Sequence, residues 1–242
     1  MNDVGEEPNP PMRQAFMKFL TAPVVVSFLV PAFGAAQSIP SSYRYLEERQ
    51  EVGLFTGLMS TGTGRFGYAP EGGTALGLRY GIELSGPLGF EGMAGVVDGT
   101  RDIVDPGRAE DDRVIGEADS RIAIIDARVR FSLPGRRSWK RLSPFLVFGG
   151  GIALDVSPSS DLDDTLLAED VFDFGSSFFG TLGVGTRWFV TDRVTARVDG
   201  LFSLWKVDTP PGYSQPARGF EGVEEGEWLR GNSLQIALMY RW

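Results

Sequence analysis

The chain has 242 residues, a formal net charge of −9, 32 glycines, and neither cysteine nor histidine. These absences exclude a disulfide framework, a thiolate metal site, a Ser-His-Asp triad, a Cys-His pair and a histidine-ligated zinc. The negative charge disfavours binding to nucleic acid, which requires a basic surface that replaces counterions. We therefore expect no nucleic-acid partner, no cofactor and no bound metal.

The N-terminal part of the chain is predicted to be an export signal. Arg13 and Lys18 precede an apolar stretch, 19–33, and the small residues at 34–36 follow it. This order of a basic, an apolar and a small-residue region is typical of a cleavable secretory signal peptide. A transmembrane anchor is the alternative, but prolines interrupt the apolar stretch and no basic stop-transfer segment follows it.

The first residues of the chain do not resemble the start of a signal. The segment before Met12 is acidic and rich in proline, which indicates that Met12 is the true start. Cleavage is expected after Ala36, or after Gly34. The domain organisation is therefore an N-terminal extension with a signal peptide, 1–36, followed by a barrel domain, 37–242.

Beyond the signal, eight segments alternate apolar and polar residues with a period of two, which predicts β-strands. The clearest is the last one, from Asn232, where one face is entirely apolar. That face carries Leu234, Ile236, Leu238, Tyr240 and Trp242. The other predicted strands run near 50–59, 75–84, 88–97, 123–131, 144–156, 174–190 and 194–206.

The predicted connections alternate in length. Short turns lie at 85–87 and 191–193, and a moderately longer one at 134–143. Long polar connections are predicted at 60–73, 98–119, 157–173 and 207–231. This pattern predicts an all-β chain, an eight-stranded antiparallel up-and-down transmembrane β-barrel with short periplasmic turns and long extracellular loops.

The polar face of these strands carries glycines and a nearly balanced set of charges. Glycine suits the crowded interior of a narrow barrel, where opposite charges can satisfy one another, so this face is predicted to line the lumen. The predicted lumen charges are Arg79, Glu83, Glu91, Asp126, Arg128, Arg130, Arg187, Arg197, Asp199 and Arg241. Aromatic residues gather where the strands meet the short turns, as an interfacial girdle would.

The alternating LQIALMYRW at the C-terminus and the hairpin-like GVGTRWFVTDRVTARVDG, 183–200, resemble the small outer-membrane barrels of the OmpA/OmpX/OmpW type. The resemblance covers 45–242. It implies that Leu238, Tyr240 and Trp242 are read by the outer-membrane assembly machinery, with Leu234 and Ile236 continuing the signal. An edge strand that only closes the barrel is the alternative reading, and both can hold. The expected location is the outer membrane, with its lipids and lipopolysaccharide as partners and a monomer as the expected state.

The other motifs of the sequence do not predict a catalytic, nucleotide-binding or metal-binding site. The GTGRFG at 62–67 fits a dinucleotide motif, but no helix is predicted behind it to face a pyrophosphate. The acidic residues of 161–170 lack the spacing of a calcium loop, so a solvated loop is favoured. The basic residues of the turn at 136–141 could either solubilise the rim or contact anionic lipid headgroups.

The predicted function is a non-enzymatic barrel with a structural or surface-interaction role and acidic extracellular loops. Lipid-modifying enzymes of the barrel architecture that this chain resembles use a catalytic histidine. This chain has no histidine, so the resemblance does not imply that activity here. Two alternatives stay open. One is a narrow channel or a conduit for small hydrophobic molecules of the OmpW type, and the other is a soluble periplasmic barrel that binds a lipophile.

Overall fold

The computed structural model describes residues 41–47, 49–173 and 175–242. The predicted extension and signal peptide, 1–36, lie outside these residues. Within the described part the regular structure consists of β-strands and four short 3₁₀ turns. No helix among the described residues is long and apolar enough to cross a membrane.

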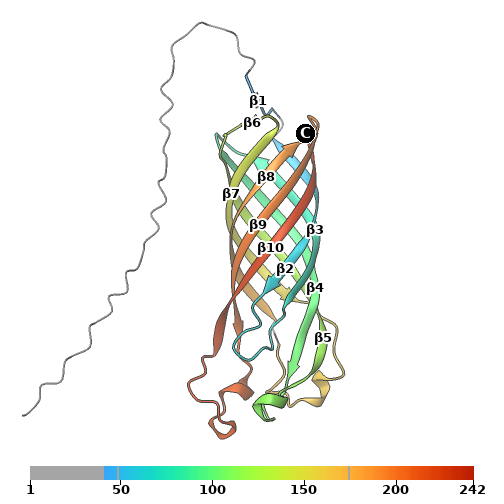
Figure 1. Cartoon of the computed structure of the whole chain (residues 1–242), viewed down its shortest axis with the longest axis vertical. Helices are drawn as coiled ribbons and strands as arrows, with labels where there is room; N and C mark the ends of the chain where they lie inside the picture. The colour runs from blue at the N-terminus through green and yellow to red at the C-terminus, as the bar shows by residue number, and fades with distance from the viewer. Residues whose placement is uncertain (1–40, 48, 174) are drawn as a thin grey trace, which may run out of the picture. The chain divides into compact units, whose positions relative to one another are not determined.

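The strands form one continuous antiparallel sheet. Their bounds are β1 Tyr43–Tyr45, β2 Gln50–Thr61, β3 Gly72–Glu83, β4 Leu88–Val104, β5 Val114–Ser132, β6 Arg137–Trp139, β7 Leu142–Asp155, β8 Ser176–Phe189, β9 Val194–Asp208 and β10 Gly226–Arg241. All except β1 and β6 follow one another around a barrel, which closes where β10 pairs with β2 and β7 pairs with β8 (Figure 1). The predicted fold class, a closed eight-stranded antiparallel barrel, is confirmed.

The period of two in the sequence becomes an alternation of inward and outward side chains. On β5, Asp126, Arg128 and Arg130 are buried inside the barrel, whereas Ile125 and Phe131 are 60% and 40% exposed on the outer wall. Successive side chains of a strand point to opposite faces, so each barrel strand divides its residues in this way. On this part of β5 the inner face is therefore charged while the outer face is apolar.

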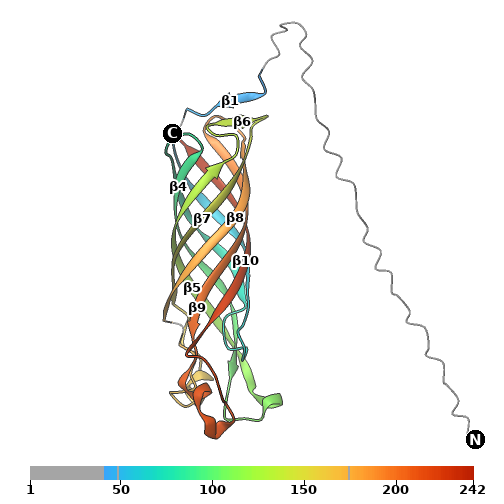
Figure 2. The ribbon, with the colours of Figure 1, turned by 90° about the vertical axis from the view of Figure 1, so that its left-hand side faces the viewer.

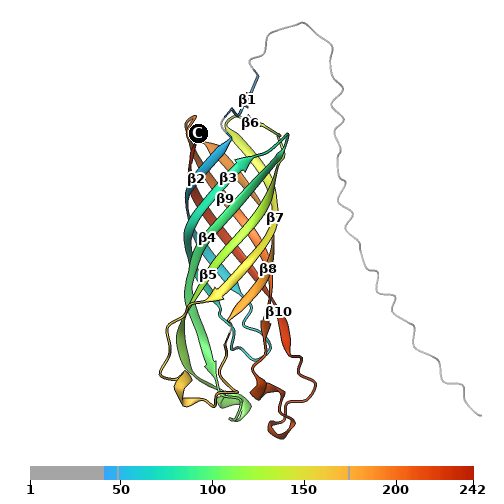
Figure 3. The same ribbon diagram turned by 180° about the vertical axis from the view of Figure 1, so that it is seen from behind.

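The two ends of the barrel differ. The C-terminus and the short connections lie at one end, called here the short-turn end, and the long connections lie together at the other, the long-loop end (Figure 3). Three of the four long connections are shorter than predicted, and the third along the chain, 156–175, is slightly longer. β4 and β5 continue to Val104 and from Val114, so most of 98–119 is a protruding hairpin and its loop is only 105–113. β9 and β10 likewise leave 209–225 as the loop within the predicted 207–231.

These strand extensions have a physical cause. Beyond the apolar band the outward residues are charged, for example Asp98 opposite Arg121, so the ladder continues into water. On the inner face of the same hairpin, Ile103 and Val104 are buried. The ladder thus keeps its backbone hydrogen bonds and a buried inner face after the outer wall has become polar. The alternation of the outer residues alone did not reveal that the strands continue.

β1 and β6 were not predicted, and they lie across the short-turn end of the barrel (Figure 2). β1 pairs with β6, which occupies the middle of the predicted turn at 134–143. Leu46 donates its backbone N–H to the Arg136 carbonyl at 3.0 Å, and Arg136 donates from Nη2 to the Leu46 carbonyl at 3.0 Å. The basic turn therefore holds the segment that precedes β2.

Glycine allows close packing at one point of the inner wall. A Cβ at Gly77 would lie 2.3 Å from the Ala94 carbonyl oxygen and 2.6 Å from Cε1 of Phe55, which is buried in the lumen. Gly92, on the adjacent strand, has no atom within 4 Å of the corresponding position. Of these two positions only Gly77 requires glycine, because a side chain there would clash with the atoms around it.

We predict that Gly77→Val destabilises the barrel by about 1–3 kcal/mol, because the added carbons overpack the wall against Phe55. Gly92→Ala is the matched control and should leave the free energy of unfolding unchanged within about 0.5 kcal/mol. Urea unfolding in lipid vesicles, followed by tryptophan fluorescence, measures both. Equal stability of the two variants would contradict the packing described here.

Candidate functional site

The half of the lumen toward the short-turn end is filled by a continuous network of ion pairs. Arg130 lies at its centre and contacts three carboxylates. Its Nη1 donates to Glu51 Oε1 at 2.8 Å and to Glu91 Oε1 at 2.5 Å, and its Nη2 donates to Glu83 Oε1 at 2.5 Å. The Arg130 side chain is fully buried.

The network extends from Glu91 across the barrel. Arg197 donates from Nη1 to Glu91 Oε1 at 2.5 Å and from Nε to Asp199 Oδ1 at 2.6 Å. Asp199 also pairs with Arg79, whose Nη2 donates to Gln235 Oε1 at 2.8 Å. These contacts join β4, β9, β3 and β10, so the network spans the lumen rather than following one wall.

The network is closed toward the short turns by Arg187. Its Nη1 donates to Glu83 Oε1 at 2.5 Å, and its Nη2 donates to Ser132 Oγ at 3.2 Å. On β7, which supplies no charge to the network, Phe145 lies with its ring centroid 4.2 Å from the Arg197 guanidinium carbon. Each strand of the barrel therefore contributes a side chain, and the buried charges neutralise one another where water would otherwise be needed.

The other half of the lumen, toward the long loops, is apolar. A cluster of buried side chains there includes Met93, Val97, Ile122, Trp205 and Leu229. Between this cluster and the ion pairs lies a cavity of about 40 Å³ that both apolar and polar side chains line, among them Arg128 and Gln235. Arg128 donates from Nη2 to Asp126 at 2.6 Å.

Aromatic residues of the loops cover the apolar half. Phe66 packs on Tyr213 with ring centroids 4.7 Å apart, and Tyr68 packs on Phe172 at 4.9 Å. Burial raises the pKa of the Tyr68 hydroxyl to about 12, and this hydroxyl lies 3.1 Å from Glu227 Oε1. Burial also raises the pKa of Tyr213, which donates to the Val104 carbonyl at 3.1 Å. The two tyrosines therefore stay neutral and bind the cap to the barrel rim.

Ion pairs fix the remaining loops. Arg101 donates to Asp163 at 2.5 Å, and Arg218 pairs with Asp170 at 2.5 Å and with Glu169 at 2.9 Å. Asp170 is buried and Asp163 half-buried, so the prediction of a solvated loop is wrong for these two residues, whereas Glu169 is exposed. Other acidic residues face the solvent at this end, namely Glu110, Asp111, Asp112, Asp161, Asp164, Glu221, Glu224 and Glu225.

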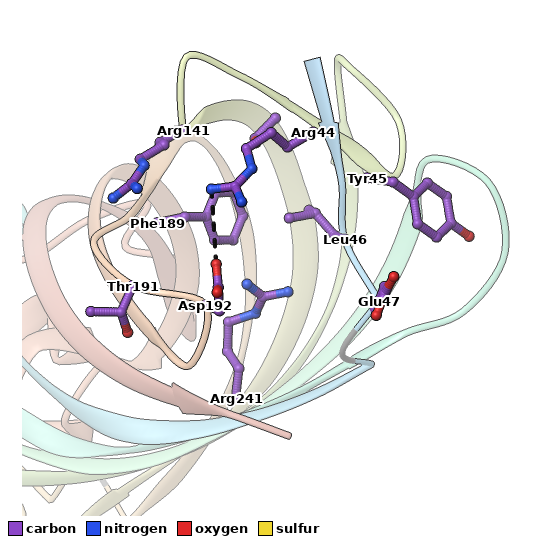
Figure 4. Close-up of a pocket in the computed structure, with 10 residues that line it drawn as sticks. Arg44, Tyr45, Leu46, Glu47, Arg141, Phe189, Thr191, Asp192 and Arg241 are labelled. Atoms are coloured by element: carbon purple, nitrogen blue, oxygen red, sulfur yellow. Dashed lines mark ion pairs between the residues drawn. The ribbon is translucent and has the colours of Figure 1, made fainter. Parts of the chain in front are cut away.

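At the short-turn end a cavity of about 260 Å³ lies beneath β1 (Figure 4). Arg44, Glu47 and Arg241 lie around it, and Arg44 faces Asp192 with 3.9 Å between nitrogen and oxygen. Arg241 is buried, with its guanidinium carbon 4.6 Å from the centroid of the Phe189 ring.

The outer wall of the barrel is apolar. On β4 the outward residues from Leu88 to Val96 are uncharged and mostly apolar, and the next one outward is Asp98. That segment has the length of about 9–11 residues that a transmembrane strand needs. The girdle predicted at the short-turn end is exposed on this wall, where Tyr80, Phe131, Trp188, Tyr240 and Trp242 are 38–52% exposed. Such a surface suits a lipid bilayer and contradicts the soluble alternative.

The structure places the sequence-predicted residues in three groups. Nine of the predicted lumen charges lie in or beside the ion-pair network, and Arg241 lies at the short-turn cavity. Leu234, Ile236, Leu238, Tyr240 and Trp242 are exposed on the outer wall of β10, and their role as an assembly signal stays a prediction. Glu51 and Gln235 were missed as lumen residues. Glu51 was concealed because large apolar residues occur on both faces of the predicted strand 50–59, as at Leu54 and Phe55, and Gln235 carries no charge.

We predict that Arg130→Met destabilises the barrel by about 3–5 kcal/mol, because it leaves three carboxylates buried without their shared cation. Arg121→Met, on the same strand, removes an exposed pair with Asp98 and should cost less than about 1 kcal/mol. Unfolding in urea at pH 7, read by gel mobility without heating, compares them. Similar losses in the two variants would show that the buried network does not depend on Arg130.

No model of a known protein family matches the sequence, and none of the curated proteins matches it. Solved structures do resemble it. The outer-membrane protein OprG from Pseudomonas aeruginosa is 11% identical with a TM-score of 0.50, over 82% of this chain and 97% of that chain. Neisserial surface protein A is 13% identical with a TM-score of 0.47, over 84% and 98%. Ail of Yersinia pestis is 11% identical with a TM-score of 0.40, over 81% and 99%. The closed barrel, its apolar outer wall and its likeness to OprG identify the chain as an eight-stranded transmembrane β-barrel with the fold of the bacterial outer-membrane proteins.

Proposed function

We propose that this protein is a sealed, non-catalytic barrel of the outer membrane whose long acidic loops form a surface for interaction. The observation that carries the proposal is the ion-pair network centred on Arg130, which occupies the lumen with side chains from around the barrel. An eight-stranded barrel leaves room for little more than its own side chains. The network therefore leaves no continuous path for water or ions.

The loops support the second part of the proposal. The aromatic cap and the pairs of Arg101 and Arg218 hold the loops against one another, so they offer a preformed surface. The acidic residues left facing the solvent give that surface a negative field, which favours a cationic partner. The contacts of the cap use aromatic residues of the loops, so the acidic groups remain for recognition, together with the exposed Leu162 and Leu167.

A conduit for small hydrophobic molecules is the second candidate, and the apolar half of the lumen favours it. Its cavity of about 40 Å³ has room for about three water-sized groups, which is too little for a lipophile. Transport would require Phe66, Tyr68 and Tyr213 to move away from the lumen. In that case the cap would be a gate and not a fixed cover.

The purified barrel in a planar bilayer is predicted to show little or no ionic conductance, because charged side chains close the lumen on themselves. A general porin in the same bilayer provides the positive control. Stable open channels would overturn the sealed barrel. Uptake of a hydrophobic dye by vesicles without ionic conductance would instead favour the conduit.

The long-loop end is predicted to face the cell exterior, since bacterial barrels keep their short turns in the periplasm. A short tag inserted beside Asp163 should be labelled on intact cells, and the same tag beside Arg137 should be labelled only after the outer membrane is opened. Labelling of the second tag alone on intact cells would invert the topology and remove the loops as a surface for external partners.

A further inference from the structure

The outer wall carries an open groove that the proposed function does not use. It has a volume of about 920 Å³ and crosses β8, β9, β10 and β2 within the apolar band. Leu58, Leu182, Val184 and Leu234, which line it, are 58–66% exposed. Gly200 lies among these large side chains, and a Cβ placed on it would meet only the Val184 carbonyl oxygen, at 4.0 Å. The missing side chain of Gly200 is what hollows the wall.

The strand register orders the groove into rungs. One rung runs Val184, Gly200, Leu234 and Leu58 across the four strands. The next rung toward the long loops runs Leu182, Phe202, Asn232 and Ser60. The apolar floor therefore gives way to an amide and a hydroxyl at its long-loop end. Beyond them the exposed apolar residues Leu204 and Trp228 lie beside Arg230 and Lys206.

Two basic residues stand directly beyond that polar rung. Arg230 is on the same face of β10 as Asn232, two residues or about 7 Å further along the strand. Its partner on β9 is Leu204, and the next pair is Lys206 opposite Trp228. Arg230 and Lys206 are thus diagonal neighbours on the outer face, a placement that brings Cα atoms to about 7–8 Å.

These two cations are exposed, and no ion pair of either is present among the residues that the structure describes. Arg121, by contrast, is an outward arginine at the edge of the same band and is paired with Asp98. Asp208 lies two residues beyond Lys206 and farther from the groove. On the outer faces of β9 and β10, Lys206 and Arg230 thus carry positive charge without an ion pair among the described residues, and both lie beyond the long-loop end of the groove.

We propose that this groove is a binding site for a phosphorylated lipid of the outer leaflet. One acyl chain lies in the hollow over Gly200, the lipid's ester or amide groups meet Asn232 and Ser60, and a phosphate accepts hydrogen bonds from Arg230 and Lys206. Guanidinium and ammonium groups are the side chains that bind phosphate most strongly. The proposal rests on the orientation inferred above, since only that orientation places the two cations in the outer leaflet.

A second copy of the chain is a poorer occupant. A two-fold interface buries the same patch of both subunits. It would bring two sets of Arg230 and Lys206 together, and burying like charges against one another is strongly unfavourable. A phosphorylated lipid supplies both the apolar chain and the compensating charge.

The test measures binding of lipid A to the folded full-length barrel in mild detergent, by native mass spectrometry and by tryptophan fluorescence. Lipid A stripped of its phosphates is the matched probe. The wild type should prefer the phosphorylated form by about tenfold, and Lys206→Ala with Arg230→Ala should remove that preference. Gly200→Leu should weaken both forms about tenfold, because its side chain occupies the hollow.

Arg121→Ala is the control variant and should bind like the wild type. Gel mobility without heating establishes that each variant is folded, and Gly200→Ala provides a milder replacement if Gly200→Leu is not. Equal binding of the two lipids by the wild type, or unchanged binding by the Gly200 variants, would overturn the site. If the wild type forms dimers and Gly200→Leu dissociates them, the groove would be assigned to a second copy of the chain. Tag labelling is independent of lipid binding, so an inverted topology would be recognised separately.

Discussion

The need to satisfy the backbone polar groups without water governs this structure. A strand in lipid has no water to bond, so the sheet has to close, and here it closes through the pairing of β10 with β2. Closure turns one face of each strand inward. Because the apolar face of each strand contacts lipid, the charged face lines the lumen. There its groups have only other side chains of the protein as partners.

That constraint explains why Arg130 and its neighbours form a network and not separate pairs. One guanidinium has several donors in a plane, and Arg130 uses two of its nitrogens to reach Glu51, Glu83 and Glu91 from three other strands. Each carboxylate then meets a second arginine or lies close to one. A network of this kind fixes the positions of the strands relative to one another, and in the function proposed above it also closes the lumen.

The same barrel separates two kinds of surface. The lumen is occupied, so exchange with the environment falls to the loops and to the outer wall. The loops are braced by an aromatic cap and leave acidic groups outward, whereas the wall has a groove over Gly200 with Arg230 and Lys206 at its end. One surface suits a soluble cationic partner and the other an anionic lipid, so both can be engaged at once.

The sequence by itself determined the barrel, its eight strands and most of the residues that face inward, because a period of two is a local property of each strand. It could not decide how Arg79, Glu91 and Asp199 are paired, since these residues lie on different strands and come together only across a closed lumen. The aromatic cap could not be predicted from the sequence, because its residues belong to loops without periodicity. These residues are Phe66, Tyr68, Phe172 and Tyr213. The pairing of β1 with β6 and the groove at Gly200 are also tertiary facts. Both depend on which strands become neighbours once the sheet has closed.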